Sequence, residues 1–216
     1  MWKEPVSGAG NGWDVGTRME LGIHERLLGR SRLPCRDAEC RLKPTIRKAT
    51  RRDARAFLDL LVGLANFEHL EPPDAAAKRR IVRDIFSRRR AFLYVATLEN
   101  RCVGYALYFY TYSSFLARPT LYLEDIFVGD EFRGRGIGHA LFMACVGEAL
   151  KQQCGRMEWA VLTWNLNAIR FYETLGATRL DDWYTYRLTS EAISRLYPSK
   201  SSPASAGKTR DNAVGH

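Results

Sequence analysis

The sequence predicts a single α/β domain with a mixed, mostly antiparallel sheet flanked by helices. In the first half, apolar and aromatic-rich stretches joined by short turns indicate strands in hairpin order. In the second half, strands alternate with stretches of helical period, which is typical of crossover units. Of the 216 residues, 46% are hydrophobic, which is enough for a buried core.

Composition divides the chain into three parts. Residues 1–44 are rich in Gly, Arg and Pro, so we expect a largely mobile N-terminal extension. Residues 197–216 are rich in Ser, Pro, Gly and Ala, so we expect a disordered C-terminal tail. The folded domain then covers residues 45–196.

The first half of this domain is expected to hold three strands and two helices. Thr50, with Asp53 three residues later, is a candidate helix N-cap, and two prolines at 72 and 73 separate the helices. The expected elements are a strand at 45–49, a helix from Thr50 to residue 67, a helix at 74–88, and two strands within 91–113 that turn at residues 99–101.

The second half is expected to alternate strands and helices. The expected elements are a strand at 121–128, a helix at 135–151, a strand at 157–162, a helix at 167–176 and a last strand at 181–189. Gly176 stands at the end of the second helix, a common position for glycine.

A glycine-rich segment, RGRGIG at 133–138, lies between an expected strand and an expected helix. Its glycines permit positive φ and let a ligand approach the backbone closely. The start of the helix adds unpaired N–H groups and the positive end of a dipole. Together these features predict a cradle for an anion such as a pyrophosphate.

Two common phosphate motifs do not fit this segment. A dinucleotide-binding G-x-G-x-x-G that starts at Gly134 would need a third glycine where His139 stands. A P-loop would need Gly-Lys-Ser/Thr, which the segment lacks.

The pattern Arg-x-x-Gly-x-Gly at 133–138 resembles the acetyl-CoA pyrophosphate loop of the GNAT superfamily of N-acetyltransferases. A second element, NLNAIRFY at 165–172 followed by LGA at 175–177, fits at the expected distance. Over residues 45–190 the chain looks most like the spermidine/spermine (diamine) and thialysine N-acetyltransferases. The resemblance implies the GNAT (acyl-CoA N-acyltransferase) fold and transfer of acetyl from acetyl-CoA to a primary amine.

The resemblance also implies roles for the matching residues. Tyr172 points at the thioester sulfur, where it can protonate the departing thiolate, and Asn165 contacts the pantetheine arm. The other cosubstrate-binding residues are Ile126, Phe127 and Val128 for the acetyl and pantetheine portion, and the N–H groups of Arg133, Gly134, Arg135, Gly136, Ile137, Gly138 and His139 for the pyrophosphate.

The acids of LYLEDIFV suit the chemistry of amine acetylation. An alkylamine with a pKa of ~10.4 must lose a proton before it attacks a thioester. A carboxylate can accept that proton and attract the cation. Glu124 and Asp125 are adjacent, so they point to opposite faces unless a bulge intervenes. We expect Glu124 to be the base, or else a structural ion pair with an arginine, and Asp125 to be more structural than catalytic, although both are candidates for substrate binding.

The amine itself is less well defined. Glu68 lies where the relatives place an acid that faces the polyamine, although a solvated helix end is the alternative. The polyamine enzymes also carry an acid and a tryptophan after the third strand, where this chain has Ser113, Ser114 and Phe115. The missing acid makes a shorter amine or an amino-acid side chain as plausible as spermidine.

The formal charge of +9 favours an anionic partner, and a phosphorylated cosubstrate is one. We expect the basic runs within 78–90 to form a solvated face and expect no nucleic acid, because no aromatic interleaving accompanies them. No apolar run reaches the ~18 residues of a membrane span, and no secretory signal is visible. We therefore expect a cytoplasmic protein that does not bind a membrane.

Five cysteines without a CxxC pair predict reduced thiols, and the chemistry requires no metal. His69 and His139 are expected at the surface or at helix caps. The relatives are homodimers, so a homodimer is possible here. The alternatives to a small-amine acetyltransferase are a protein or peptide acetyltransferase, a non-catalytic acyl-CoA-binding module and a basic nucleic-acid-associated protein.

Overall fold

The computed structural model describes residues 43–197 of the chain. The chain divides into two units between Lys43 and Pro44, and the described elements all belong to the second unit. The expected extension and tail, residues 1–44 and 197–216, therefore fall almost entirely outside the described residues.

The described elements follow the predicted order up to the helix that carries Tyr172. They are β1 (Thr45–Lys48), η2 (Arg51–Asp53), α1 (Ala54–Phe67), α2 (Ala75–Phe86), β2 (Phe92–Leu98), β3 (Arg101–Ser113), β4 (Arg118–Val128), η3 (Asp130–Phe132), α3 (Ile137–Lys151), β5 (Arg156–Trp159), α4 (Leu166–Thr174) and α5 (Ser190–Leu196). The two η elements are single turns of 3-10 helix.

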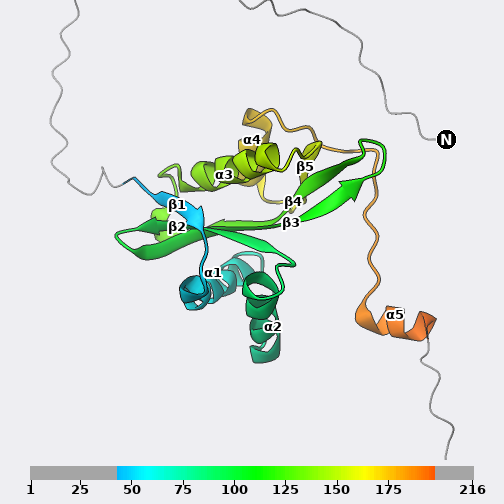
Figure 1. Cartoon of the computed structure of the whole chain (residues 1–216), viewed down its shortest axis with the longest axis horizontal. Coiled ribbons are helices and arrows are strands. Elements are labelled where there is room, and N and C mark those ends of the chain that lie inside the picture. Colours follow the sequence, from blue (N-terminus) through cyan, green and yellow to red (C-terminus); the bar gives the residue numbers. More distant parts are fainter. Residues whose placement is uncertain (1–42, 198–216) are drawn as a thin grey trace, which may run out of the picture. The chain divides into compact units, whose positions relative to one another are not determined.

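The strands form one sheet in the order β1-β2-β3-β4-β5. The first four strands pair antiparallel, whereas β4 and β5 run parallel. Helices α1 and α2 lie on one face of the sheet, and α3 and α4 lie on the other (Figure 1). The predicted mixed, mostly antiparallel sheet flanked by helices is therefore confirmed.

The hairpin between β2 and β3 turns at the predicted place. Glu99 and Asn100 have φ angles of 48° and 65°, and two-residue type I′ turns require positive φ at both positions. The turn aligns Leu98 with Arg101 and so fixes the register next to the turn, whereas an irregularity between Ala96 and Thr97 shifts the register of the rest of the β2–β3 pair.

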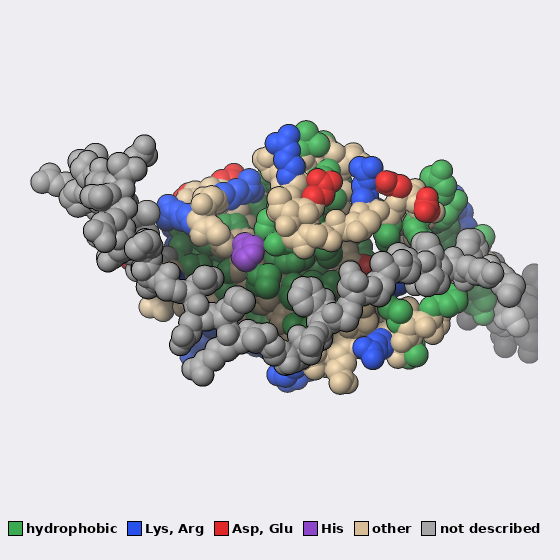
Figure 2. Space-filling view, turned by 90° about the horizontal axis from the view of Figure 1, so that it is seen from above, with side chains coloured by type: hydrophobic (Ala, Val, Ile, Leu, Met, Phe, Trp, Pro, Cys, Tyr) green, Lys and Arg blue, Asp and Glu red, His purple; other side chains and the backbone are tan. Residues whose placement is uncertain are grey.

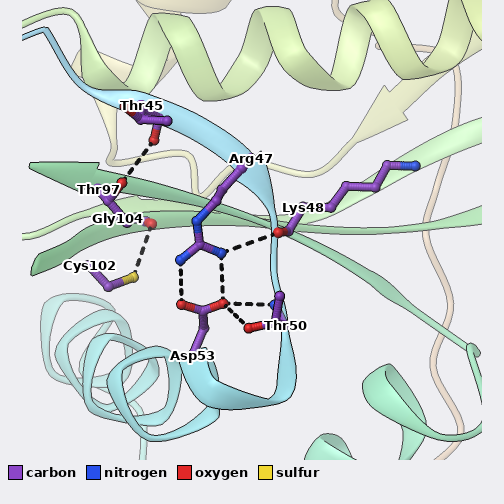
Figure 3. A network of polar contacts seen from close by, with 8 residues as sticks. All are labelled: Thr45, Arg47, Lys48, Thr50, Asp53, Thr97, Cys102 and Gly104. Carbon is purple, nitrogen blue, oxygen red and sulfur yellow. Dashed lines mark hydrogen bonds and ion pairs between the residues drawn. The ribbon is translucent and has the colours of Figure 1, made fainter. Parts of the chain in front are cut away.

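A polar network ties the start of α1 to β1 (Figure 3). Arg47 donates from both terminal nitrogens to the carboxylate of Asp53, at 2.8 and 2.7 Å. The backbone N–H of Thr50 donates to the same carboxylate at 2.7 Å. The hydrogen bonds from Arg47 lower the pKa of Asp53 to about 2, although burial acts the other way. The cap predicted at Thr50 and Asp53 is confirmed, and it opens a 3-10 turn that continues into α1.

Hydrophobic clusters fill both faces of the sheet. The cluster under α3 and α4 includes the buried Tyr108, Leu121 and Leu141. The cluster under α1 and α2 includes the buried Phe57 and Tyr105. Alternate residues of the central strands therefore serve opposite clusters, as the two-residue period of a strand requires.

Strands β4 and β5 are paired over a short stretch only. Thr120–Leu123 of β4 aligns with Arg156–Trp159 of β5. Beyond Leu123, β4 keeps its other partner, β3, as far as Val128. Within residues 43–197, the edge of β4 from Glu124 to Val128 therefore has no strand partner on the β5 side, and alternate backbone groups there are available to a ligand.

The prediction of a last strand at 181–189 is wrong. These residues lie outside the described sheet, and α5 follows them. Trp183, Tyr184 and Tyr186 are 74%, 86% and 90% exposed. Alternating aromatics indicate a strand, but β-propensity needs a neighbouring strand and a packed face to be realised. Residues 43–197 offer this segment neither. Strand β5 likewise ends at Trp159 and not at residue 162.

Hydrophobic side chains also reach the surface around α3 and α4, on the face shown in Figure 2. Met143 and Leu150 of α3 are 45% and 75% exposed, and Leu166 at the start of α4 is 56% exposed. The helices on this side therefore expose part of their hydrophobic surface to solvent, whereas the sheet beneath them is buried.

Candidate active site

A β-bulge in β4 positions the two acids predicted there. The register of β3 against β4 shifts by one residue at Glu124, which has no partner. Because a bulge interrupts the alternation of faces, Leu123 packs under α3 while Asp125 turns to the α1 face beside Tyr105. Asp125 is partly buried, whereas Glu124 is exposed.

Asp125 lies in a cluster of acids. The Tyr105 hydroxyl donates to Oδ2 of Asp125 at 3.5 Å. Burial, followed by the negative charges of Glu124 and Glu68, raises the pKa of Asp125 to about 7, against the effect of the Tyr105 hydrogen bond. Burial also raises the pKa of Glu68. A carboxyl group with a pKa near neutrality can exchange a proton at physiological pH, as a general base must.

The acid cluster has no basic counterpart in the described chain. Among the ion pairs within residues 43–197, none involves Glu68, Glu124 or Asp125. The alternative of a structural pair between Glu124 and an arginine therefore finds no support there. Acids that face one another without a cation suit a site that receives one.

Glu68 is presented by the end of α1. The N–H of Leu70 donates to Ala65 at 2.9 Å and that of His69 to Asn66 at 3.3 Å, which is the hydrogen-bond pattern of a Schellman cap. His69 occupies the left-handed position of this cap with a φ of 58°. The cap role expected for His69 is thus confirmed, and it fixes the backbone on which Glu68 stands.

The glycine-rich loop has the geometry of an anion cradle. Gly134 and Gly136 both have φ of 75°, and a Cβ atom at either position would meet nothing within 4 Å. The first helical N–H with a carbonyl partner is that of Ala140, which donates to Gly136 at 3.0 Å. The N–H groups of the preceding first turn of α3, Ile137 to His139, are therefore open toward the loop.

The two arginines of this loop already make hydrogen bonds to preceding carbonyl groups. The N–H of Arg133 already donates to the carbonyl of Asp130 at 3.2 Å, so the free donors of the cradle begin at Gly134. The Arg135 guanidinium donates to the carbonyl of Glu131 at 3.3 Å. His139 lies exposed in the first turn of α3, which agrees with the surface position expected for it.

Helix α4 carries the expected tyrosine and begins at the expected asparagine. Oδ1 of Asn165 accepts from the N–H of Ala168 at 3.2 Å and caps the helix, so its side-chain amide group is still free to donate. Tyr172 is buried against Phe142 and Trp159. Burial raises the pKa of Tyr172 to about 12, so the hydroxyl keeps its proton at neutral pH.

The segment after β3 is built as a turn. The Ser113 hydroxyl accepts from the N–H of Leu116 at 3.3 Å, while Phe115 is 73% exposed. Ser113 therefore serves the turn, and the segment presents neither an acid nor a tryptophan.

Sequence reasoning missed three contributors. Tyr105 reaches Asp125, the Arg133 side chain stacks on Phe67 at the end of α1, and Trp164 packs on the same phenylalanine. Strand alternation could have placed Tyr105 on the face of Asp125 only if the bulge had been known. The contacts of Phe67 join segments far apart in the chain, and no local pattern signals them.

Two kinds of structural feature are absent from residues 43–197. No group of three or more His, Cys, Asp or Glu side chains there could hold a metal ion. No helix of this part of the chain is long and apolar enough to cross a membrane.

The comparisons with known proteins identify the class of protein to which this fold and these features belong. The family model described as "Acetyltransferase (GNAT) family" matches residues 55–177. The chain therefore belongs to the GNAT acetyltransferase family.

Two enzymes illustrate the relationship. L-ornithine N5-acetyltransferase of Arabidopsis thaliana is 43% identical over 93 residues, which are 43% of this chain and 41% of that enzyme. Thialysine N-epsilon-acetyltransferase of Sus scrofa is 34% identical over 163 residues, covering 70% of this chain and 95% of the relative. The match to the plant enzyme thus spans less than half of its length, whereas the match to the pig enzyme spans nearly all of it.

Solved structures share the fold. An integron cassette protein from the mobile metagenome of V. cholerae superposes with a TM-score of 0.62 at 21% identity, covering 72% of this chain and 98% of that one. At this level of identity the likeness concerns the fold alone.

Proposed function

We propose that this protein transfers the acetyl group of acetyl-CoA to a primary amine of a small cationic substrate, by direct attack of the amine within a ternary complex. The acid cluster at the β4 bulge carries the proposal, because it combines a carboxyl group poised near neutrality with two further acids and no basic partner. Such a cluster attracts a protonated amine and can take its proton.

Asp125 is the better proton acceptor of the two adjacent acids. It is partly buried next to Tyr105, and its pKa of about 7 allows it to be ionised and yet basic enough to deprotonate an ammonium group. The sequence favoured Glu124, which is exposed and which we assign to attraction of the cation at the entrance. The charge of Glu68, at the C-cap of α1, acts on the same carboxyl group, and we assign Glu68 to hold the far end of the substrate.

The residues present fit acetyl-CoA. The cradle of Gly134 to His139 suits its pyrophosphate, and the unpaired β4 edge at Ile126–Val128 suits its pantetheine arm. When bound, acetyl-CoA supplies the activated acetyl group. Tyr172, protonated at neutral pH, can donate its proton to the departing thiolate, whose pKa is ~8.5 by analogy with cysteine.

The turn after β3 bears on the length of the amine substrate. The turn after β3 uses Ser113 for its own hydrogen bond and offers no acid for a second, distant ammonium group. We therefore favour a short diamine or a lysine-like amino acid over spermidine or spermine. The names of the two enzymes cited above, which refer to ornithine and thialysine, point the same way.

Release of CoA thiol from acetyl-CoA, measured against a panel of amines, tests the proposal. The panel should contain L-ornithine, thialysine, 1,4-diaminobutane, spermidine and a lysine-containing peptide. We expect kcat/KM to be highest for a short diamine or amino acid. Binding of CoA without thiol release from any amine would indicate a non-catalytic module, and preference for the peptide would indicate a protein acetyltransferase.

Tyr172→Phe tests the proton donor in the same assay. We expect kcat to fall by about 10²-fold or more, because the thiolate must then leave unprotonated. Tyr186→Phe is the matched control, since Tyr186 is 90% exposed and outside the proposed site. Equal turnover by both variants would remove Tyr172 from the mechanism.

A further inference from the structure

Three parts of the proposed site meet at Phe67, the last residue of α1. The guanidinium carbon of Arg133, in the loop of the cradle, lies 4.7 Å from the centre of the Phe67 ring. The Trp164 ring, directly before the cap of α4, lies 5.5 Å from the same ring, centre to centre. The residue that follows Phe67 is Glu68, which belongs to the acid cluster.

The Arg133 side chain is held on several sides. Its Nε donates to the carbonyl of Val128 at 3.1 Å, and its Nη2 pairs with Asp130 at 2.8 Å. The guanidinium group also stacks over Phe127 at 5.4 Å. The side chain of the first residue of the glycine-rich loop therefore links this loop to β4, to η3 and to the Phe67 ring of α1.

The end of α1 is the kind of segment that such a contact can order. Its last hydrogen bonds run from Glu68 to Leu64 at 2.9 Å and from Leu70 to Ala65 at 2.9 Å. The cap places a non-glycine residue, His69, in the left-handed region, which costs conformational energy. Helix ends open more easily than helix centres, so the position of Glu68 depends on what holds Phe67.

We propose that the stack of Arg133 on Phe67 couples the two substrate sites. Binding of the CoA phosphates restrains the loop that begins at Arg133, and the stack on Phe67 passes this restraint to the end of α1, where it places Glu68 for the amine. By linkage, the amine must strengthen CoA binding by the same factor. The inference rests on the proposed function, and it makes Arg133 a positioning residue that acts through its side chain.

Hydrogen exchange of the full chain with and without coenzyme A tests the coupling without any amine. In the wild type we expect CoA to slow exchange in two segments, the cradle at 134–141 and the end of α1 at 64–70. In Arg133→Met we expect the cradle to stay protected while the protection of 64–70 is lost. Phe67→Leu, which removes the ring from the other side of the contact, should behave in the same way.

Arg101→Met is the matched control. Arg101 also stacks on an aromatic ring, that of Phe132 at 5.0 Å, and pairs with an acid of η3, Glu131 at 2.6 Å. Neither its ion pair nor its ring contact involves α1, so this variant should protect both segments as the wild type does. Two results would overturn the coupling but not the proposed cosubstrate site. One is protection of residues 64–70 by CoA in both Arg133→Met and Phe67→Leu. The other is a wild type in which CoA protects the cradle but not residues 64–70.

A steady-state measurement separates coupling from mere loss of structure. With L-ornithine as the amine probe, Arg133→Met should raise the amine KM at saturating acetyl-CoA about fivefold or more, while the Kd of CoA measured without amine changes less than twofold. An unchanged amine KM, or an equal rise in the amine KM and in the Kd of CoA alone, would contradict the coupling. If CoA protects neither segment in the wild type, the proposed cosubstrate site fails, and the coupling fails with it.

Discussion

Glu148 on α3 and Asp125 on β4 are carboxylates packed against opposite faces of the same sheet, and their partners differ. Glu148 accepts from Lys48 at 3.2 Å, from Tyr94 at 3.1 Å and from Tyr110 at 3.3 Å, and Gln152 also donates to it at 3.2 Å. With partners in the described part of the chain, Asp125 makes one hydrogen bond, at 3.5 Å.

These partners shift the two pKa values in opposite directions. Burial alone would raise the pKa of Glu148, but the hydrogen bond and charge of Lys48 and the other donors lower it below the ordinary value. Asp125 loses solvent through burial and experiences the like charges of Glu124 and Glu68, so its pKa rises to about 7. A satisfied carboxylate supports the fold, whereas an unsatisfied one is available for chemistry.

Asp125→Asn should produce the largest change in activity. It removes the proton acceptor but keeps the shape of the side chain, so we expect kcat/KM to fall about 10²–10⁴-fold. The substitution should not lower the free energy of unfolding at neutral pH, because it replaces a carboxyl group whose charge is unfavourable in the folded state by a neutral amide. Amine kinetics and denaturant unfolding on the same sample measure both effects, and a small loss of activity with a large loss of stability would reverse the assignment.

Glu148→Gln should show the converse behaviour. The variant weakens a charge-assisted network, so we expect the free energy of unfolding to fall by about 1–3 kcal/mol. Activity of the folded protein should stay within about twofold, since the network lies across the sheet from the acid cluster. Urea unfolding at neutral pH measures the first effect, and thiol release well below the unfolding midpoint measures the second.

The pH dependence of stability should separate the two groups by sign. Asp125 has a folded pKa above its unfolded value of about 3.8, so its contribution to stability is present at low pH and is lost between about pH 4 and 7. Glu148 has a lowered folded pKa, so its contribution is present above about pH 4.5 and is lost as the solution becomes more acidic.

The variants convert this difference into a measurement. From pH 4 to 7, Asp125→Asn should gain stability relative to the wild type and then level off. Glu148→Gln should lose stability relative to the wild type over the acidic range as pH rises. Urea midpoints at a series of pH values test both slopes, and slopes of the same sign would contradict the contrast.

The smallest expected effect concerns two helix ends, one on each face. Gln153 after α3 has a φ of 53°, and the N–H of Cys154 donates to Ala149 at 2.9 Å, so α3 ends with the same cap as α1. Gln153→Gly should raise the free energy of unfolding by about 0.5–1 kcal/mol, because glycine adopts the left-handed region without strain.

His69→Gly makes the same change on the other face. Its gain in stability should be similar, but it should also raise the amine KM. His69 follows Glu68 directly, and its ring lies 6.2 Å from that of Trp164, so removal of this ring should loosen the end of α1 that carries Glu68. Equal amine KM values for His69→Gly and Gln153→Gly would show that the end of α1 does not hold the substrate.

Sequence patterns predicted most of the fold because local rules determine most of it. The apolar and aromatic-rich stretches of β2 to β4, the turn at Glu99 and Asn100 and the capping pair of Thr50 and Asp53 are all local features. The cradle was also predictable, since glycines between a strand and a helix have few other uses.

The features that sequence patterns missed depend on pairing between distant segments. The bulge at Glu124 arises from the register of β3 against β4, and it turns Asp125 to the α1 face of the sheet, beside Tyr105. The segment at 181–189 has the composition of a strand but no neighbouring strand within the described residues. The contact of Arg133 with Phe67 is likewise a product of packing and has no sequence signature.

The pH profile of kcat/KM for the wild type and Asp125→Asn, with the best amine of the panel, tests the role of Asp125 most directly. The profile of free enzyme and free substrate reports the ionisation of the essential base. We predict that kcat/KM of the wild type rises through a pKa of about 7 and that this step is absent from Asp125→Asn. The same step in both proteins would contradict the assignment.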